Sequence, residues 1–179
     1  MTLPTAEAKR QIAQIAAKHR SELEAQNFRH SLTLNIQGWA NPAHALLELL
    51  QNADDAGPAG SNRTVAVEFD FRQDGLVVRH NGKPFSADDA RGICSIGDST
   101  KSAEKHIGFM GIGFKSVYKF AGSAYIRSGP YSFAFTPDNY PDDPYAWVIV
   151  PSWCDRFPSE EIDGGQTTLF LQYGSEMAG

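Results

Sequence analysis

Three polar side chains, spaced as on one face of a helix, could share a metal-assisted hydrolysis. Glu48, Asn52 and Asp55 stand at positions i, i+4 and i+7, so a helix places them on one side. The amide oxygen of Asn52 is a hard ligand suited to Mg²⁺, and the carboxylate of Glu48 can accept a proton from an attacking water. The same spacing is typical of the solvated face of an amphipathic helix. Spacing alone therefore leaves both interpretations open.

A glycine-rich run is the second candidate site. It reads Gly108-Phe109-Met110-Gly111-Ile112-Gly113 and precedes Phe114 and Lys115, where a helix is expected to begin near Gly113. Glycines let the backbone approach phosphate oxygens, and the free N–H groups of a helix N-terminus favour anions. The Walker A pattern is absent. The preceding segment is polar, unlike the buried strand that precedes a dinucleotide-binding loop. The run by itself is weak evidence.

Hydrophobic periodicity predicts the elements that must position these residues. Helices are expected over about 5–27 and 42–53, with Ser86 as the N-cap of another. Leu46, Leu50 and Ala53 are expected to pack the second helix on a sheet. Strands are predicted within 65–71, 76–79, 124–128, 131–135, 147–150 and 167–173, with a surface loop at 137–145. The pattern indicates an α/β fold, a two-layer sandwich with a mixed, mainly antiparallel sheet and helices on one face.

Composition excludes several classes of protein. The chain has 179 residues, 41% of them hydrophobic and 21% charged, as in an ordinary globular domain. Its net charge of −5 gives no signal for nucleic acid or a membrane surface, and no apolar run approaches the roughly 20 residues that span a bilayer. Two cysteines are too few for a disulfide scaffold, so a cytoplasmic setting is expected. Residues 1–30 are expected to form an N-terminal helical segment and 31–179 the domain itself.

The order of the motifs resembles that of the GHKL ATPase family, which includes gyrase B, Hsp90, histidine kinases and MutL. Residues 48–56, Glu-Leu-Leu-Gln-Asn-Ala-Asp-Asp-Ala, resemble the N-box of that family; a strand ending in Asn81-Gly82, a polar loop and the glycine run follow. Within the family, residues 96–101 and 111–117 are most similar to the Hsp90-like domains at the head of sacsin and its large prokaryotic relatives. The resemblance implies a Bergerat fold that binds ATP or ADP with Mg²⁺.

The resemblance also implies a role for each motif. Glu48 would be the general base, Asn52 the Mg²⁺ ligand and Asp55 a support of the nucleotide site. The segment 95–107 would form an ATP lid, in which Lys101 is either a γ-phosphate contact or a solvated lysine; the same two alternatives hold for Lys115. A phosphate nest would comprise Gly108, Phe109, Met110, Gly111, Ile112, Gly113 and Phe114.

The strand after the N-box departs from the family pattern. Most members have Asp-x-Gly-x-Gly there, and the Asp receives the adenine amino group; here His80 holds that position, followed by Asn81 and Gly82. A neutral imidazole can accept one hydrogen bond. Either His80 reads adenine in an altered, less selective site, with binding that depends on its neutral form, or water or backbone makes the contact. Thr167 is the candidate for a hydroxyl beside the base.

The expected function is Mg²⁺-dependent ATP binding and slow hydrolysis as a conformational switch, in a chaperone-like module at the head of a longer protein. Further domains, a client protein or a nucleotide-dependent homodimer would receive the signal. A nucleotide sensor without turnover is one alternative. A histidine-kinase catalytic domain is another, although no helix pair with a phosphoacceptor histidine is evident.

Overall fold

The molecule is a six-stranded sheet with its helices packed on one face. The computed structural model describes residues 5–25, 30, 42–60, 64–95, 110–143, 145–158 and 166–174. The helices are α1 (Thr5–Leu23), α3 (Pro42–Ala56), α4 (Ala87–Cys94) and α5 (Met110–Lys115), with 3₁₀ turns at Ser116–Lys119, Pro137–Asn139 and Ala146–Val148. The strands are β1 (Val67–Phe71), β2 (Gly75–His80), β3 (Ala121–Ser128), β4 (Tyr131–Phe135), β5 (Ser152–Trp153) and β6 (Thr167–Tyr173).

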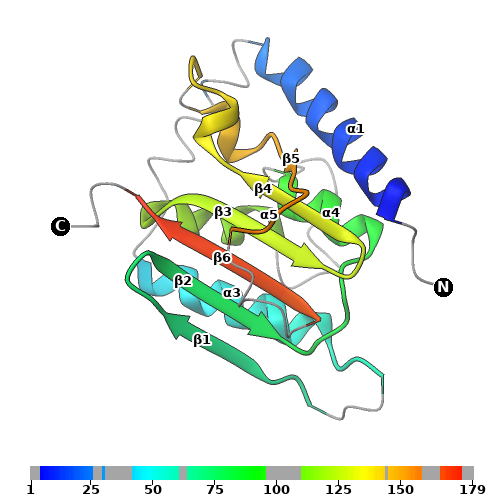
Figure 1. Ribbon diagram of the computed structural model, residues 1–179, viewed down its shortest axis with the longest axis vertical. Helices are drawn as coiled ribbons and strands as arrows, with labels where there is room; N and C mark the ends of the chain where they lie inside the picture. Colours follow the sequence, from blue (N-terminus) through cyan, green and yellow to red (C-terminus); the bar gives the residue numbers. More distant parts are fainter. Residues whose placement is uncertain are drawn as a thin grey trace.

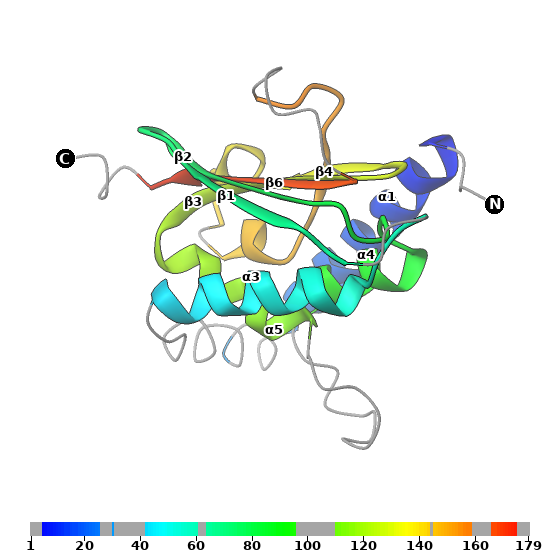
Figure 2. The ribbon, with the colours of Figure 1, turned by 90° about the horizontal axis from the view of Figure 1, so that it is seen from below.

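The strand order is β1-β2-β6-β3-β4-β5, and every pairing between these strands is antiparallel. The last strand in the sequence, β6, therefore lies in the middle of the sheet (Figure 1). Helices α3, α4 and α5 cover one face, as the view along the sheet shows (Figure 2). The prediction of a two-layer α/β sandwich is confirmed.

The main core lies between these two layers. It joins residues of the sheet, such as Val78 and Leu171, to Leu49 of α3, Ile93 of α4 and Phe114 of α5. A smaller cluster of Val77, Phe157 and Phe170 packs separately. Because strand side chains alternate between the two faces, β2 contributes Val78 to the main core and Val77 to this second cluster.

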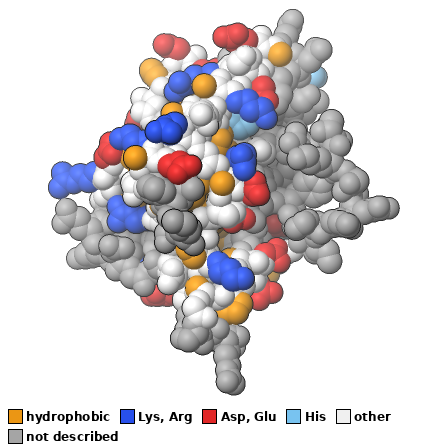
Figure 3. Space-filling view, turned by 90° about the vertical axis from the view of Figure 1, so that its right-hand side faces the viewer, with side chains coloured by type: hydrophobic (Ala, Val, Ile, Leu, Met, Phe, Trp, Pro, Cys, Tyr) orange, Lys and Arg blue, Asp and Glu red, His pale blue; other side chains and the backbone are white. Residues whose placement is uncertain are grey.

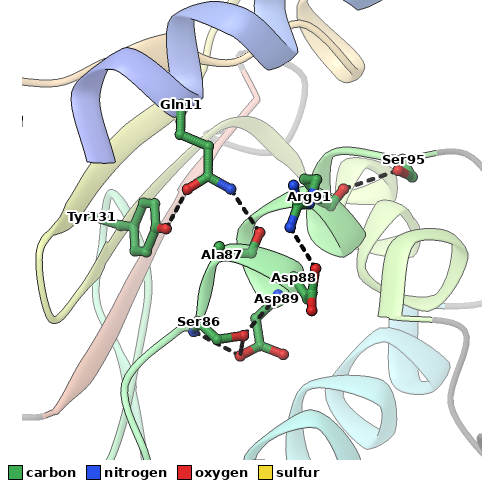
Figure 4. A network of polar contacts seen from close by, with 8 residues as sticks. All are labelled: Gln11, Ser86, Ala87, Asp88, Asp89, Arg91, Ser95 and Tyr131. Atoms are coloured by element: carbon green, nitrogen blue, oxygen red, sulfur yellow. Dashed lines mark hydrogen bonds and ion pairs between the residues drawn. The ribbon is translucent and has the colours of Figure 1, made fainter. Parts of the chain in front are cut away.

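Helix α1 packs on the body through a hydrophobic stripe and a polar contact. Its Ile12 is 1% exposed and belongs to the main core. Gln11 donates from Nε2 to the Ala87 carbonyl at 2.9 Å and accepts from the Tyr131 hydroxyl, so it links α1 to both α4 and β4 (Figure 4). Helix α1 is therefore part of the same packed unit as the sheet.

The start of α4 confirms the predicted N-cap. Ser86 and Asp89 form a reciprocal capping box, in which each side chain accepts from the backbone N–H of the other (Figure 4). Such a pair satisfies two backbone donors that a helix N-terminus otherwise leaves open. The box fixes where the chain leaves β2 and turns into α4.

Four sequence expectations about these elements are wrong. Leu50 is 46% exposed, because the face of α3 that meets the core is centred on Ala45, Leu49 and Ala53. Residues 147–150 are not a strand: Trp147 and Val148 belong to the 3₁₀ turn Ala146–Val148, and β5 comes later. A short apolar run has no periodicity that separates a strand from a buried turn. Val65 lies outside β1, and the helix expected near Gly113 begins at Met110.

Candidate nucleotide site

A cavity of about 210 Å³ lies between α3, α4 and the helix-covered face of the sheet. Its apolar lining residues are Leu49, Ala53, Ala56, Val78, Pro84, Phe85, Ile93, Phe114 and Leu169, and its polar ones are Asn52, Asp55, His80, Lys83, Ser86 and Asp89. An apolar cleft with a few convergent polar groups is typical of small-molecule sites, although such sites usually measure about 300–1,000 Å³. The cavity therefore suits the base of a nucleotide better than a whole nucleotide.

Helix α3 brings two of its three predicted residues to this cavity. Asn52 and Asp55 line the wall, and Glu48 does not. Glu48 lies one turn earlier, against α5: a Cβ on Gly113 would overlap its carboxylate and come within 2.6 Å of its Cδ. The Nδ1 atom of His44 is 3.6 Å from Glu48 Oε1. The N-box helix thus joins the cavity to the end of the glycine run.

The glycine run is only partly within the described residues. The described residues do not include Gly108, Phe109 or residues 96–107 of the expected lid, among them Lys101. The predicted roles of these residues stay predictions. Met110, Gly111, Ile112 and Gly113 form the first turn of α5, and Phe114 at its inner side is fully buried and lines the cavity. The last two glycines therefore belong to the helix rather than to a loop before it.

The end of β2 is held in place by the loop that follows α3. Gly57 adopts a positive φ of 65°, which glycine adopts without steric cost. The next residue, Pro58, forms a bridge with Gly82, and Lys83 donates its backbone N–H to the Gly57 carbonyl at 3.0 Å. A Cβ on Gly82 would meet His80 Nδ1 at 2.9 Å. Glycine at position 82 thus leaves room for the His80 ring.

His80 is 6% exposed and lines the cavity. Its Nδ1 accepts the backbone N–H of Gly82 at 3.2 Å. Burial lowers the pKa of His80 below its usual value, because a desolvated imidazolium is costly. The neutral ring is therefore the form favoured in the folded protein at neutral pH.

Two other predicted residues lie beside the cavity without lining it. Asn81 turns its side chain toward the start of β1, where its Oδ1 accepts the Ala66 N–H at 2.7 Å. Thr167 pairs with His80 across β2 and β6, but its hydroxyl is buried against that of Ser128. Both side chains already have hydrogen-bond partners, and their predicted contacts with a nucleotide stay predictions.

Lys115 does not face the cavity. Its side chain is fully buried, with Nζ 4.0 Å from the centre of the Phe135 ring and 5.6 Å from that of Phe114. Within the described part of the chain Nζ has no hydrogen-bond partner. Burial lowers the pKa of Lys115 to about 7, an effect that the neighbouring Cys94 opposes. Cys94 is itself fully buried, as expected for a small apolar residue.

Four further residues of the site carry no sequence signal that points to it. Lys83, Phe85, Ser86 and Asp89 line the cavity, because the segment between β2 and α4 runs along its edge. The sequence predicts Ser86 as the N-cap of a helix, but only the position of α4 against α3 makes this segment a wall of the cavity.

The face of the molecule drawn in Figure 3 carries described side chains of both charges. Acidic and basic side chains are interspersed on the face drawn in Figure 3, which carries no broad basic surface. No helix of the described chain is long and apolar enough to cross a membrane. Nor do its described residues hold any group of three or more His, Cys, Asp or Glu side chains placed to bind a metal.

Part of the chain is similar to known proteins. Residues 60–143 match the sacsin domain. The chain is 35% identical over 103 residues to protein NO VEIN of Arabidopsis thaliana, a segment that is 57% of this chain and 4% of that protein. It is 32% identical over 110 residues to sacsin of Homo sapiens, which is 52% of this chain and 2% of sacsin. The chain thus corresponds to a small part of each relative.

The motif order and these matches agree on the class of protein. The matches support a domain of the Hsp90-like GHKL type. At the level of the family it is related to sacsin, which confirms the resemblance seen in its motifs.

Proposed function

We propose that this domain binds a nucleoside triphosphate with Mg²⁺, hydrolyses it slowly and serves as a conformational switch. ATP is the nucleotide that the family relationship favours. The observation that carries the proposal is the meeting of α3 and α5: Asn52 lines the cavity while Glu48 lies against Gly113 at the end of the glycine run. A nucleotide whose base occupies the cavity would have its phosphates near these residues.

The donor set fits a Mg²⁺ ion that is shared with the nucleotide. Asn52 offers one hard oxygen at the cavity wall, and the described residues contain no acidic cluster that would hold the ion alone. Mg²⁺ commonly uses one or two protein oxygens and completes its shell with phosphates and water. When bound, the ion would neutralise phosphate charge. Glu48 would then take a proton from water; its half-buried carboxylate lies 3.6 Å from Nδ1 of His44, too far for a hydrogen bond.

The switch itself would lie in lid closure, as in other nucleotide-gated domains. The state of the lid would pass to further domains of a longer chain, to a client protein or to a second protomer. A cytoplasmic location is part of the same proposal.

A sensor that binds without turnover is the second candidate. It is favoured by one observation, that Glu48 does not line the cavity. Hydrolysis distinguishes the two functions, because a sensor needs the cavity but no general base.

The test combines binding with turnover. Thermal shift with ATP, ADP, GTP, ITP and non-nucleotide controls should show stabilisation by nucleotides in Mg²⁺. Glu48→Ala should keep affinity within a few-fold and lose most hydrolysis, since a general base acts on the transition state more than on binding. No shift with any nucleotide would overturn the proposal. Equal hydrolysis by wild type and variant would remove Glu48 from its role, and binding without any hydrolysis would favour the sensor.

A further inference from the structure

The hydrogen bond within the turn after β2 fixes which nitrogen of His80 can face a ligand. In a neutral imidazole one ring nitrogen accepts and the other carries the hydrogen. The Gly82 N–H donates to Nδ1 at 3.2 Å, so Nδ1 is the acceptor and the hydrogen resides on Nε2. The tautomer follows from this backbone contact. The acceptor that an adenine amino group would need is already in use.

The remaining nitrogen, Nε2, is free for a ligand. His80 lines the cavity and is 6% exposed, and Nε2 forms no hydrogen bond with the described part of the chain. A donor that a bound ligand covers without pairing it costs free energy, so a ligand that supplies an acceptor at this point gains affinity. A ligand that brings another donor leaves both donors unsatisfied.

We propose that His80 reads the nucleotide base by donating from Nε2, and that the cavity therefore prefers 6-oxopurine nucleotides, those of inosine and guanosine, to adenine nucleotides. This inference rests on the proposed nucleotide site. Adenine carries an amino group at C6, which donates, whereas hypoxanthine and guanine carry an oxygen there, which accepts. His80 is thus a specificity-determining residue, and the family's acceptor at this position is replaced by a donor.

The charged residues around the cavity do not set the protonation of His80. Asp55, Lys83 and Asp89 are the charged residues of its lining, and the lowered pKa of His80 has burial as its cause rather than any of these charges. Even a protonated ring would present Nε2–H toward the ligand. Donation by His80 is therefore retained across the pH range in which the imidazole titrates.

Calorimetric titration with ADP, IDP and GDP in Mg²⁺ tests the inference. IDP differs from ADP in its 6-oxo group and lacks the 2-amino group of GDP. The ratio of the affinities for IDP and ADP therefore isolates the contact to His80. Wild type should bind IDP at least about tenfold more tightly than ADP. The His80 donor is paired in the complex with IDP and left unpaired in the complex with ADP. His80→Asp should reverse the preference, because a carboxylate only accepts. His80→Asn should abolish it, because an amide can turn either end toward the base.

The outcomes separate this inference from the proposed function. Lys83→Ala, at the same cavity, should weaken all three nucleotides and leave the ratio of IDP to ADP unchanged. If wild type binds ADP as tightly as IDP or more tightly, the base presents a ring nitrogen to His80 and the inference is wrong, while the nucleotide site stands. If none of the three nucleotides binds, both fail. His80→Asp buries a carboxylate, so the fold of each variant is checked by circular dichroism before the titration. If His80→Asp does not fold, the wild-type ratio of IDP to ADP affinity and the ratio for His80→Asn still test the inference.

Discussion

Single side chains on α3 face two different environments. Asn52 lines the cavity, where its amide oxygen can meet a phosphate-bound cation, whereas Glu48 packs on α5 one turn away. Asp55 lies at the exposed end of the same face. A single helix can thus hold a metal ligand and a base at a fixed separation, since residues four apart are neighbours on its surface.

The role of Asn52 predicts a metal-dependent defect. Asn52→Ala removes one oxygen ligand, so nucleotide affinity measured in Mg²⁺ should fall about tenfold, the size of a lost charge-assisted contact. In EDTA the variant and wild type should bind alike. Asn52→Asp keeps a hard oxygen at the same place and should retain the Mg²⁺ dependence. An equal loss in Mg²⁺ and in EDTA would indicate damage to the cavity rather than to a metal site.

At the scale of elements, the contact between α3 and α5 explains the glycine at position 113. Glycine costs a helix about 1 kcal/mol relative to alanine, so its presence inside α5 calls for a reason. The Glu48 carboxylate occupies the space that a Cβ would fill. Glycine at position 113 lowers helix stability but leaves room for Glu48, the proposed general base.

Gly113→Ala should therefore separate stability from turnover. The added methyl meets the flexible end of Glu48, which can swing away, so the fold should survive with thermal stability unchanged or slightly raised. Hydrolysis should drop at least tenfold as the carboxylate moves, while nucleotide affinity changes little. In the Glu48→Ala background the same substitution should have no further effect, because the group it displaces is gone. Additive losses in the double variant would contradict the proposed contact.

For the whole molecule, Lys115 is the least expected feature. It lies inside the junction of the helical layer and the sheet, between Phe114 and Phe135, with its ammonium fully buried. Burying a charge without a hydrogen-bonded partner is costly, and such a group usually gives up its proton instead. The pKa of about 7 reflects that cost.

This burial makes stability depend on pH. The folded pKa of about 7 is below the usual 10.5, so as pH falls through this range the unfolded chain takes up the proton first and stability is lost. The loss is on the order of 4 kcal/mol at pH 7 and about 2 kcal/mol at pH 9. Lys115→Met should thus raise the free energy of unfolding by a few kcal/mol at pH 7, and the gain should shrink by about 2 kcal/mol at pH 9.

Urea unfolding of wild type and Lys115→Met at the two pH values measures that difference directly. Lys119→Met, at an exposed position four residues on, is the matched control and should change stability by less than about 0.5 kcal/mol at either pH. A gain for Lys115→Met that is the same at pH 7 and pH 9 would show that Lys115 keeps its ordinary pKa.

The sequence by itself determined the elements and the motifs they carry. Helix α1, strands β1 and β2 and the cap at Ser86 follow from local signals, namely hydrophobic periodicity and an N-cap residue. These features involve residues near one another in the chain, for which propensity and spacing are informative. The family could likewise be recognised from the order of the N-box and the glycine run.

Only the tertiary structure decided what surrounds each residue. The contact of Glu48 with Gly113, the burial of Lys115 against Phe135 and the exposure of Leu50 depend on partners remote in sequence. The tautomer of His80 depends on a turn held by the loop after α3. Periodicity tells which side of an element is apolar, but it does not tell which other element will cover that side. Packing in three dimensions therefore set the chemistry of the site.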